Sequence, residues 1–141
     1  MQVDLSKLIN KNDVVAVATS GGSDSMALLH YLHQNSATLQ IKVLALNVEH
    51  GIRGQSSIDD STFVKDYCKE NDIPCLTYTV DSLKKAKDDG LSVEQAARTL
   101  RYGCFFDAIE KGKCNKVATA HHLKDNLESV LFNLFRFVAI L

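Results

Sequence analysis

The sequence of 141 residues contains no tryptophan, a single proline and no long hydrophobic run. No apolar stretch approaches the roughly 20 residues that a membrane-spanning helix needs, so we expect no contact with a membrane. The first thirteen residues include Asp4, Lys7, Lys11 and Asp13, and they therefore lack the apolar core of a secretory signal peptide. These absences predict a cytoplasmic protein.

An excess of charge of either sign is also missing, since the formal net charge is −1. A domain that grips nucleic acid on its own is usually basic, so we expect any such contact to lie mostly elsewhere or in one local patch. Cysteines are present, but none has the Cys-x-x-Cys spacing, which favours reduced, packed thiols over a zinc or iron–sulfur site. They are Cys68, Cys75, Cys104 and Cys114.

What the sequence does contain is a regular alternation of short apolar runs with stretches of helical periodicity, in a length that fits one domain. The predicted strands cover 14–18, 41–48, 75–80 and 116–120, and the predicted helices cover 25–33, 57–71, 92–111 and the segment from about 123 onward. The charged segment 84–90 is expected to be a solvated loop. Strands that alternate with helices predict a doubly wound α/β fold, with a mostly parallel sheet and helices on both faces.

Two common phosphate-binding patterns are absent, because no lysine follows the glycines as in a Walker loop and no Gly-x-Gly-x-x-Gly occurs. Instead, residues 20–25 read Ser-Gly-Gly-Ser-Asp-Ser, between the first predicted strand and the first predicted helix. The glycines let the backbone approach an anion, the serines add hydroxyl groups, and the helix adds unpaired N–H groups. We therefore predict a phosphate-binding turn; the alternative is a turn that only caps the helix.

Polar clusters also follow the second and fourth predicted strands. His50 and Arg53 follow the second strand, whereas His121 and Asp125 follow the fourth. Ligands of such sheets bind beyond the carboxyl ends of the strands, so these clusters and the turn predict a single site. Asp125 could hold Mg²⁺ or simply complement the dipole of a helix start.

Two arginines share one face of the predicted helix over 92–111. Arg98 and Arg101 are three residues apart, and Glu94 is four residues before Arg98. Either arginine could contact phosphate, or Arg98 could form an exposed ion pair with Glu94 worth less than about 1 kcal/mol. The pattern alone leaves these alternatives open.

Taken together, the blocks at 20–25, 47–53, 94–102 and 118–128 resemble the tRNA(Ile)-lysidine synthase branch of the PP-loop ATP pyrophosphatase family. The resemblance implies an adenine nucleotide alpha hydrolase-like, Rossmann-like fold. It also implies a ligase that uses ATP and Mg²⁺ to adenylate the C2 carbonyl of the wobble cytidine of a tRNA(Ile) with a CAU anticodon. Free lysine then displaces AMP.

The resemblance also implies roles for individual residues. The ATP phosphates would be bound by Ser20, Gly21, Gly22, Ser23, Asp24 and Ser25. The nucleotide site would further include His50, Arg53, Arg98 and His121. Asp24, Asp125 and Arg98 would be catalytic, and the two aspartates would hold Mg²⁺.

The resemblance weakens at the C-terminal end, where Arg136 is followed by Phe137 instead of the expected glycine and the last residues are apolar. We therefore expect residues 1–141 to form a PP-loop ATP-binding catalytic domain that lacks its C-terminal strand. An open sheet edge would favour a homodimer. Three alternatives remain: a tRNA-thiolating enzyme, an amidating ligase of the same superfamily, and a fragment that binds ATP or AMP without turnover.

Overall fold

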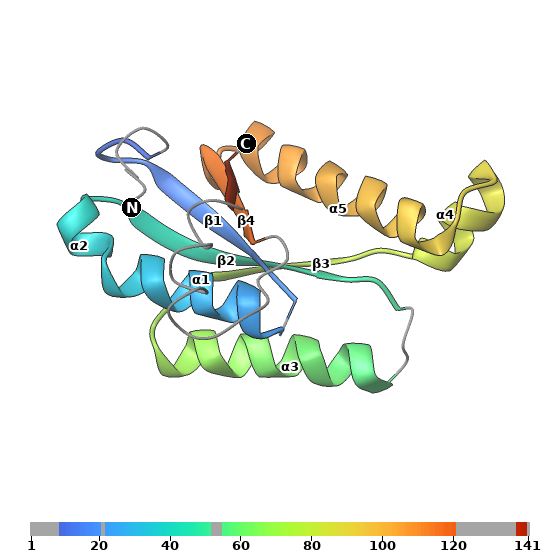
Figure 1. Cartoon of the computed structure of the whole chain (residues 1–141), viewed down its shortest axis with the longest axis horizontal. Helices are drawn as coiled ribbons and strands as arrows, with labels where there is room; N and C mark the ends of the chain where they lie inside the picture. Colours follow the sequence, from blue (N-terminus) through green and yellow to red (C-terminus); the bar gives the residue numbers. More distant parts are fainter. Residues whose placement is uncertain (1–8, 21, 52–54, 121–137, 141) are drawn as a thin grey trace.

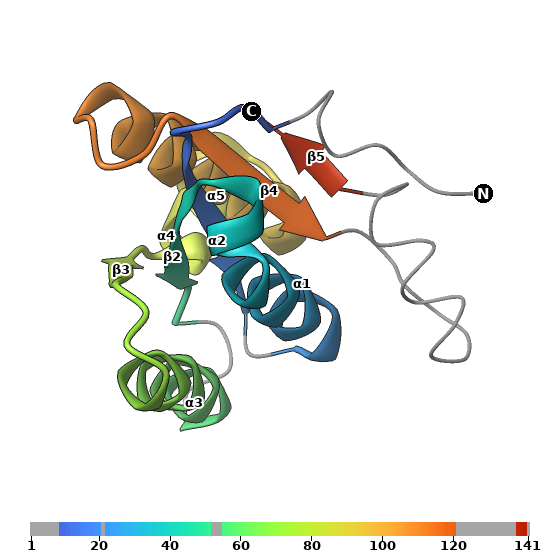
Figure 2. The same ribbon diagram turned by 90° about the vertical axis from the view of Figure 1, so that its left-hand side faces the viewer.

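The computed structural model describes residues 9–20, 22–51, 55–120 and 138–140. They form a twisted sheet with the strand order β3-β2-β1-β4-β5 and helices on both faces (Figures 1 and 2). The first four strands are parallel. The strands are β1 (Val14–Thr19), β2 (Lys42–Glu49), β3 (Cys75–Thr79), β4 (Lys116–Ala120) and β5 (Val138–Ile140). The predicted α/β fold with a mostly parallel sheet is confirmed.

The central strands are apolar throughout because helices cover both of their faces. Successive side chains of β1 alternate between two cores: Val15 and Val17 pack on one side, and Ala16 packs on the other. The first core is completed by α1 (Ser23–Gln34) and α3 (Gln55–Glu70), and the second by α5 (Val93–Glu110). The sheet therefore separates the helices α1 and α3 from α5 (Figure 2).

The helix α5 begins as its sequence predicts. The hydroxyl of Ser92 accepts the Gln95 N–H at 3.1 Å, and the Gln95 side chain accepts the Ser92 N–H at 3.1 Å. This capping box satisfies two backbone N–H groups at the helix start, those of Ser92 and Gln95. Gly103 lies inside the helix without interrupting it.

A helix replaces the loop that was expected over 84–90. In α4 (Ser82–Asp89), Asp81 caps the first turn by accepting the Lys84 N–H at 3.0 Å, and Gly90 ends the helix with φ +65°. Ser82 and Ala86 are buried, whereas the remaining positions are charged except for the exposed Leu83. The expectation of a loop is wrong because the charges lie on one side of a capped amphipathic helix. The structure also contains a short helix, α2 (Ser36–Leu39).

The sheet edge beside β4 is not open. Residues 138–140 pair antiparallel with β4, in the register Ala118↔Ile140 to Ala120↔Val138. This finding corrects the expectation of a missing strand at that edge, because an apolar, β-branched segment supplies one. It also removes the reason given for a homodimer. The helix expected from about residue 123 onward does not include 138–140, which form β5. Its other residues lie outside the described residues.

Within the described ranges, no helix combines the length and the apolar character that crossing a bilayer would demand.

Candidate nucleotide-binding site

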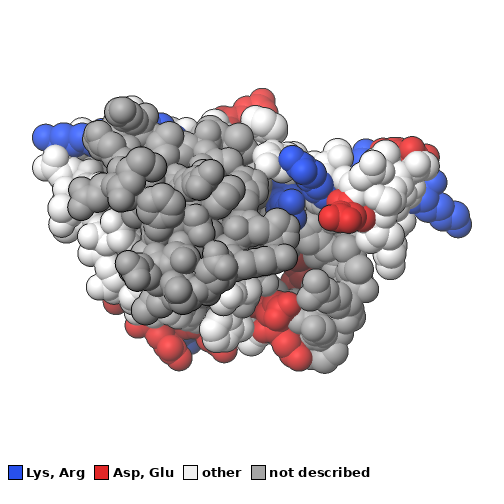
Figure 3. All heavy atoms as spheres, viewed as in Figure 1, with Lys and Arg blue, Asp and Glu red and all other residues white. Residues whose placement is uncertain are grey.

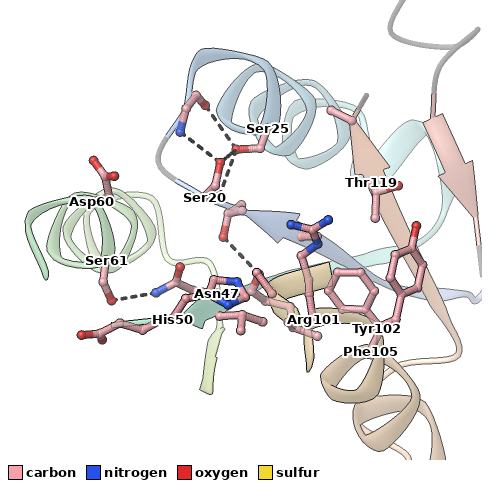
Figure 4. A pocket seen from close by; sticks show the side chains of 18 of the residues that line it. Ser20, Ser25, Asn47, His50, Asp60, Ser61, Arg101, Tyr102, Phe105 and Thr119 are labelled. Atoms are coloured by element: carbon pink, nitrogen blue, oxygen red, sulfur yellow. Dashed lines mark hydrogen bonds between the residues drawn. The ribbon is translucent and has the colours of Figure 1, made fainter. Parts of the chain in front are cut away.

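A cleft of about 730 Å³ lies at the carboxyl ends of β1, β2 and β4, with α3 and α5 as its walls (Figure 4). The chain leaves β1 toward β2 on one side and reaches β4 on the other, which makes this position the switch point where α/β sheets bind ligands. The volume falls within the roughly 300–1,000 Å³ of small-molecule sites. The described part of the cleft is lined by Ala18, Thr19, Ser20, Gly22, Ser25, Leu46, Asn47, Val48, Glu49, His50, Asp60, Ser61, Glu94, Ala97, Arg101, Tyr102, Phe105, Thr119 and Ala120.

The serine side chains of the predicted phosphate-binding turn fold back onto its backbone. Ser25 is buried, and its hydroxyl accepts the Ser20 N–H at 3.1 Å and donates to the Gly22 carbonyl at 3.2 Å. The Ser20 hydroxyl accepts the Gly22 N–H at 3.3 Å. Ser25 therefore acts first as a brace for the turn, whereas the exposed Ser20 hydroxyl lines the cleft.

The N-terminus of α1 is arranged to receive an anion. Its N-cap is Gly22, which makes no side-chain hydrogen bond to the first turn. Helix starts of this kind present N–H groups and a positive dipole end to negative charge. A Cβ at Gly22 would lie 3.3 Å from the Ser20 hydroxyl, so a larger residue would crowd the turn. Ser23 and Asp24 lie in this first turn but are not among the described residues that line the cleft.

Hydrogen bonds connect the strands beneath the cleft, β1 and β2, with each other and with α3. The Asn47 amide on β2 donates to the Ser61 hydroxyl on α3 at 2.7 Å, and both residues are buried. The Thr19 hydroxyl donates to the Leu46 carbonyl at 3.3 Å and links β1 to β2. These residues were not predicted as part of the site, although Thr19 and Asn47 lie at or near the ends of β1 and β2.

His50 forms a hydrogen bond with the first residue of α4. Its Nδ1 lies 2.8 Å from the hydroxyl of the fully buried Ser82. Burial lowers the pKa of His50, and the nearby positive charge of Arg101 lowers the pKa further. His50 is therefore mostly neutral at about pH 7.

On α5, Arg101 lines the described part of the cleft and Arg98 does not. Figure 4 shows the guanidinium of Arg101 projecting into the pocket. The guanidinium carbon of Arg98 lies 5.6 Å from the ring centroid of Tyr102, a cation–π distance. Tyr102 in turn packs edge-on against Phe105, with 5.3 Å between ring centroids. Of the two arginines that the sequence left open, Arg101 is the one that reaches the cleft.

The carboxylates that line the described part of the cleft are Glu49, Asp60 and Glu94. Among the described residues, no three His, Cys, Asp or Glu side chains gather into a metal-binding group. Mg²⁺ bound to nucleotide needs only one or two carboxylates, so this finding leaves the predicted magnesium ligands as a prediction. Four of the predicted site residues lie outside the described residues: Gly21, Arg53, His121 and Asp125.

All four cysteines are free thiols and none of them lines the described part of the cleft. Cys68, Cys104 and Cys114 are buried, and burial raises the pKa of each thiol, to about 12 for Cys68. Packed, protonated thiols are what the sequence predicts for them.

The fold and the cleft define an α/β domain with a Gly/Ser turn between β1 and α1. The chain belongs to the PP-loop domain family, whose profile matches residues 1–140. It is 36% identical over 129 residues to a tRNA(Ile)-lysidine synthase of Clostridium tetani, a match that covers 92% of this chain and 28% of the relative. The corresponding protein of Petrotoga mobilis is 34% identical over 130 residues, which cover 92% of this chain and 42% of that relative.

The chain thus spans less than half the length of these curated relatives. Among solved structures, it is similar to the U34-tRNA thiolase NcsA from Methanococcus maripaludis, determined with its [4Fe-4S] cluster. The TM-score is 0.66 at 22% identity, over 92% of this chain and 45% of that chain. This similarity shows the shared fold alone.

Proposed function

We propose that this chain is the ATP-binding part of a tRNA-modifying ligase of the lysidine synthase type. The observation that carries the proposal is the convergence of the turn, His50 and Arg101 on one cleft at the switch point of the sheet. The lysidine synthases that the chain resembles over more than nine-tenths of its length support the choice of reaction. A tRNA-modifying ligase works where tRNA is, which supports the predicted cytoplasmic location.

The proposed reaction has two steps. The C2 carbonyl oxygen of the wobble cytidine attacks the α-phosphorus of ATP, and the bond to pyrophosphate breaks. The ε-amine of free lysine, after losing a proton, then attacks C2, and the C2–O bond breaks as AMP leaves with the oxygen. The substrates are therefore ATP, free lysine and a tRNA(Ile) with a CAU anticodon.

Within the cleft, different groups would bind the phosphates and neutralise their charge. The N–H groups at the start of α1 and the hydroxyl of Ser20 would hold the β- and γ-phosphates, which leave as pyrophosphate. Arg101 would neutralise charge that moves onto the departing phosphates, since a guanidinium can make two hydrogen bonds to phosphate. By resemblance, Arg98, Asp24 and Asp125 are proposed as further catalytic residues. Mg²⁺ held by the two aspartates would shield the phosphate charge.

Surface charge is consistent with a tRNA grip that lies largely elsewhere in the protein. On the face of the molecule that Figure 3 shows, Lys and Arg side chains are interspersed with Asp and Glu side chains over the described residues. A net charge of −1 gives little general attraction to a polyanion. We therefore propose that the portions that the longer relatives have in addition supply most of the tRNA affinity.

The decisive experiment mixes the protein with ATP, Mg²⁺, labelled lysine and tRNA transcripts. Label that enters a CAU-anticodon tRNA, but not a GAU-anticodon control, supports the ligase. Binding of ATP without transfer of label selects the alternative of a nucleotide-binding fragment. If the chain binds no ATP, as judged by isothermal titration calorimetry, the proposal is rejected.

The thiolation alternative needs a reactive cysteine or a cysteine-bound cluster near the nucleotide. The cysteines of this chain lie away from the described part of the cleft, and three are buried. No observation favours an amidating ligase over the lysidine synthase type.

A further inference from the structure

Behind the cleft, the buried contact between His50 and Ser82 joins the end of β2 to the start of α4. His50 is among the residues that line the cleft, whereas Ser82 is not and has no exposed surface. The two side chains meet through Nδ1 and Oγ at 2.8 Å. The remaining polar atom of the ring, Nε2, is thus the one that a ligand in the cleft can use.

The direction of this hydrogen bond follows from the needs of the serine. A buried hydroxyl hydrogen requires an acceptor, and leaving it without one costs about 1–3 kcal/mol. Among the described residues, the hydrogen-bond partner of the Ser82 hydroxyl is Nδ1 of His50. If the hydroxyl donates to Nδ1, this nitrogen carries no proton, and in a neutral imidazole the proton then resides on Nε2.

We propose that Ser82 is a positioning residue that holds His50 as the neutral Nε2–H tautomer, a hydrogen-bond donor to an oxygen of ATP in the cleft. The inference rests on the proposed function for its ligand, but the tautomer belongs to the free chain. A neutral imidazole can donate to an oxygen without adding a second full positive charge beside Arg101.

The surroundings of His50 act in the same direction. Protonation of Nδ1 would remove the acceptor of the Ser82 hydroxyl, and Arg101 on α5 disfavours a second cation nearby. Glu49 on β2, Asp60 on α3 and Glu94 on α5 also line the described part of the cleft. The pKa of His50 is nevertheless lowered, by burial first and by the charge of Arg101 second.

The test begins with the tautomer in the free wild-type chain. Two-bond ¹⁵N–¹H correlation spectra of the imidazoles distinguish the Nε2–H form, the Nδ1–H form and the cation, and His50→Gln identifies the resonances of His50. We expect the Nε2–H form at neutral pH. A predominant Nδ1–H form or a cation would overturn the inference, whether or not the chain binds ATP.

The second arm compares Ser82→Ala with Ser36→Ala, which removes a serine hydroxyl that donates at 2.8 Å to the backbone carbonyl of His33 in the distant α1–α2 region. Ser82→Ala should give a mixture of tautomers and a higher His50 pKa, and it should weaken ATP binding by roughly 3- to 10-fold. Ser36→Ala should leave all three unchanged.

The two failures are distinguishable. If the wild-type chain does not bind ATP, the proposed function fails, whereas the spectra still decide the tautomer. If ATP binds and Ser82→Ala folds but shifts neither the tautomer nor the affinity, the positioning role is wrong. If Ser82→Ala does not fold, the wild-type spectrum and the loss of ATP affinity in His50→Gln decide the matter.

Discussion

The Lys116 ammonium lies 2.7 Å from the Asp13 carboxylate at the end of the sheet opposite the cleft. Asp13 is buried at 5% exposure, and its carboxylate also accepts the Asn10 N–H at 2.6 Å and the Asn115 amide at 2.8 Å. Asn115 itself accepts the N–H of Val14, the first residue of β1. This network fixes the starts of β1 and β4 relative to each other.

Replacing Lys116 with methionine should destabilise the chain by about 1–3 kcal/mol, because the buried Asp13 carboxylate loses its charged partner. The free energy of unfolding in urea measures the effect. The matched control is Lys85→Met, which removes an exposed i,i+4 ion pair with Asp89 and should cost less than about 0.5 kcal/mol. Equal losses in the two variants would contradict the role of burial.

The same network predicts how stability depends on pH. Burial acts to raise the pKa of Asp13, but the hydrogen bonds and the charge of Lys116 outweigh it, so the pKa falls below 3.8. A carboxyl with a depressed pKa in the folded state stabilises the fold above its unfolded pKa, and this contribution fades as pH falls through the folded value. The difference in unfolding free energy between wild type and Asp13→Asn should therefore be constant above about pH 5 and shrink below pH 3.8. If the difference in unfolding free energy stayed constant down to the lowest pH measured, the lowered pKa of Asp13 in the folded state would be contradicted.

Ser25→Ala removes the brace of the phosphate-binding turn, because the Ser20 N–H and the Gly22 carbonyl both lose a partner. We expect ATP affinity to fall about tenfold, on the order of 1–1.5 kcal/mol, as the turn loses its preorganised shape. Titration calorimetry measures the affinity, with Ser36→Ala as the control. Unchanged affinity would show that the turn keeps its shape without this hydroxyl.

The two arginines of α5 can be separated by experiment. Arg101→Ala should weaken ATP binding by about tenfold to a hundredfold, since it removes a charged donor from the cleft. Arg98→Ala should affect binding less, because Arg98 lies against Tyr102. The comparison also tests the catalytic role predicted for Arg98, if pyrophosphate exchange is measured beside binding. An Arg98→Ala variant with normal exchange would refute that role.

The thiols should differ in their reaction with iodoacetamide. Cys68, Cys104 and Cys114 are buried with raised pKa values, so little thiolate forms at about pH 8. Cys75 is only partly buried and should be alkylated first, as peptide mass spectrometry would show. Rapid modification of Cys104 or Cys114 in the folded chain would contradict this order.

The sheet could be predicted from the sequence because its strands are short apolar runs separated by helical periodicity. The helix α4 could not, since its segment is strongly charged and only two small residues, Ser82 and Ala86, are buried in it. Its cap, Asp81, and its final Gly90 were the available signals.

The described lining of the cleft could be predicted only in part. Residues that follow strands, such as Ser20 and His50, were found because the chain order places them at the sheet edge. The choice between Arg98 and Arg101 depends on the rotation of α5 about its own axis, which spacing within one helix does not determine. Ser82 was not predicted because it lies on α4, whereas His50, whose ring it contacts, follows β2.

The two helices that wall the cleft, α3 and α5, pack into different hydrophobic cores. Val64 and Cys68 anchor α3 in the core on one side of the sheet, whereas Phe105 and Ala108 anchor α5 in the core on the other. A change of side-chain volume beneath α5 would therefore move Arg101 while leaving the opposite wall in place. Evolution can adjust how this chain handles each end of a ligand independently, by repacking one core at a time.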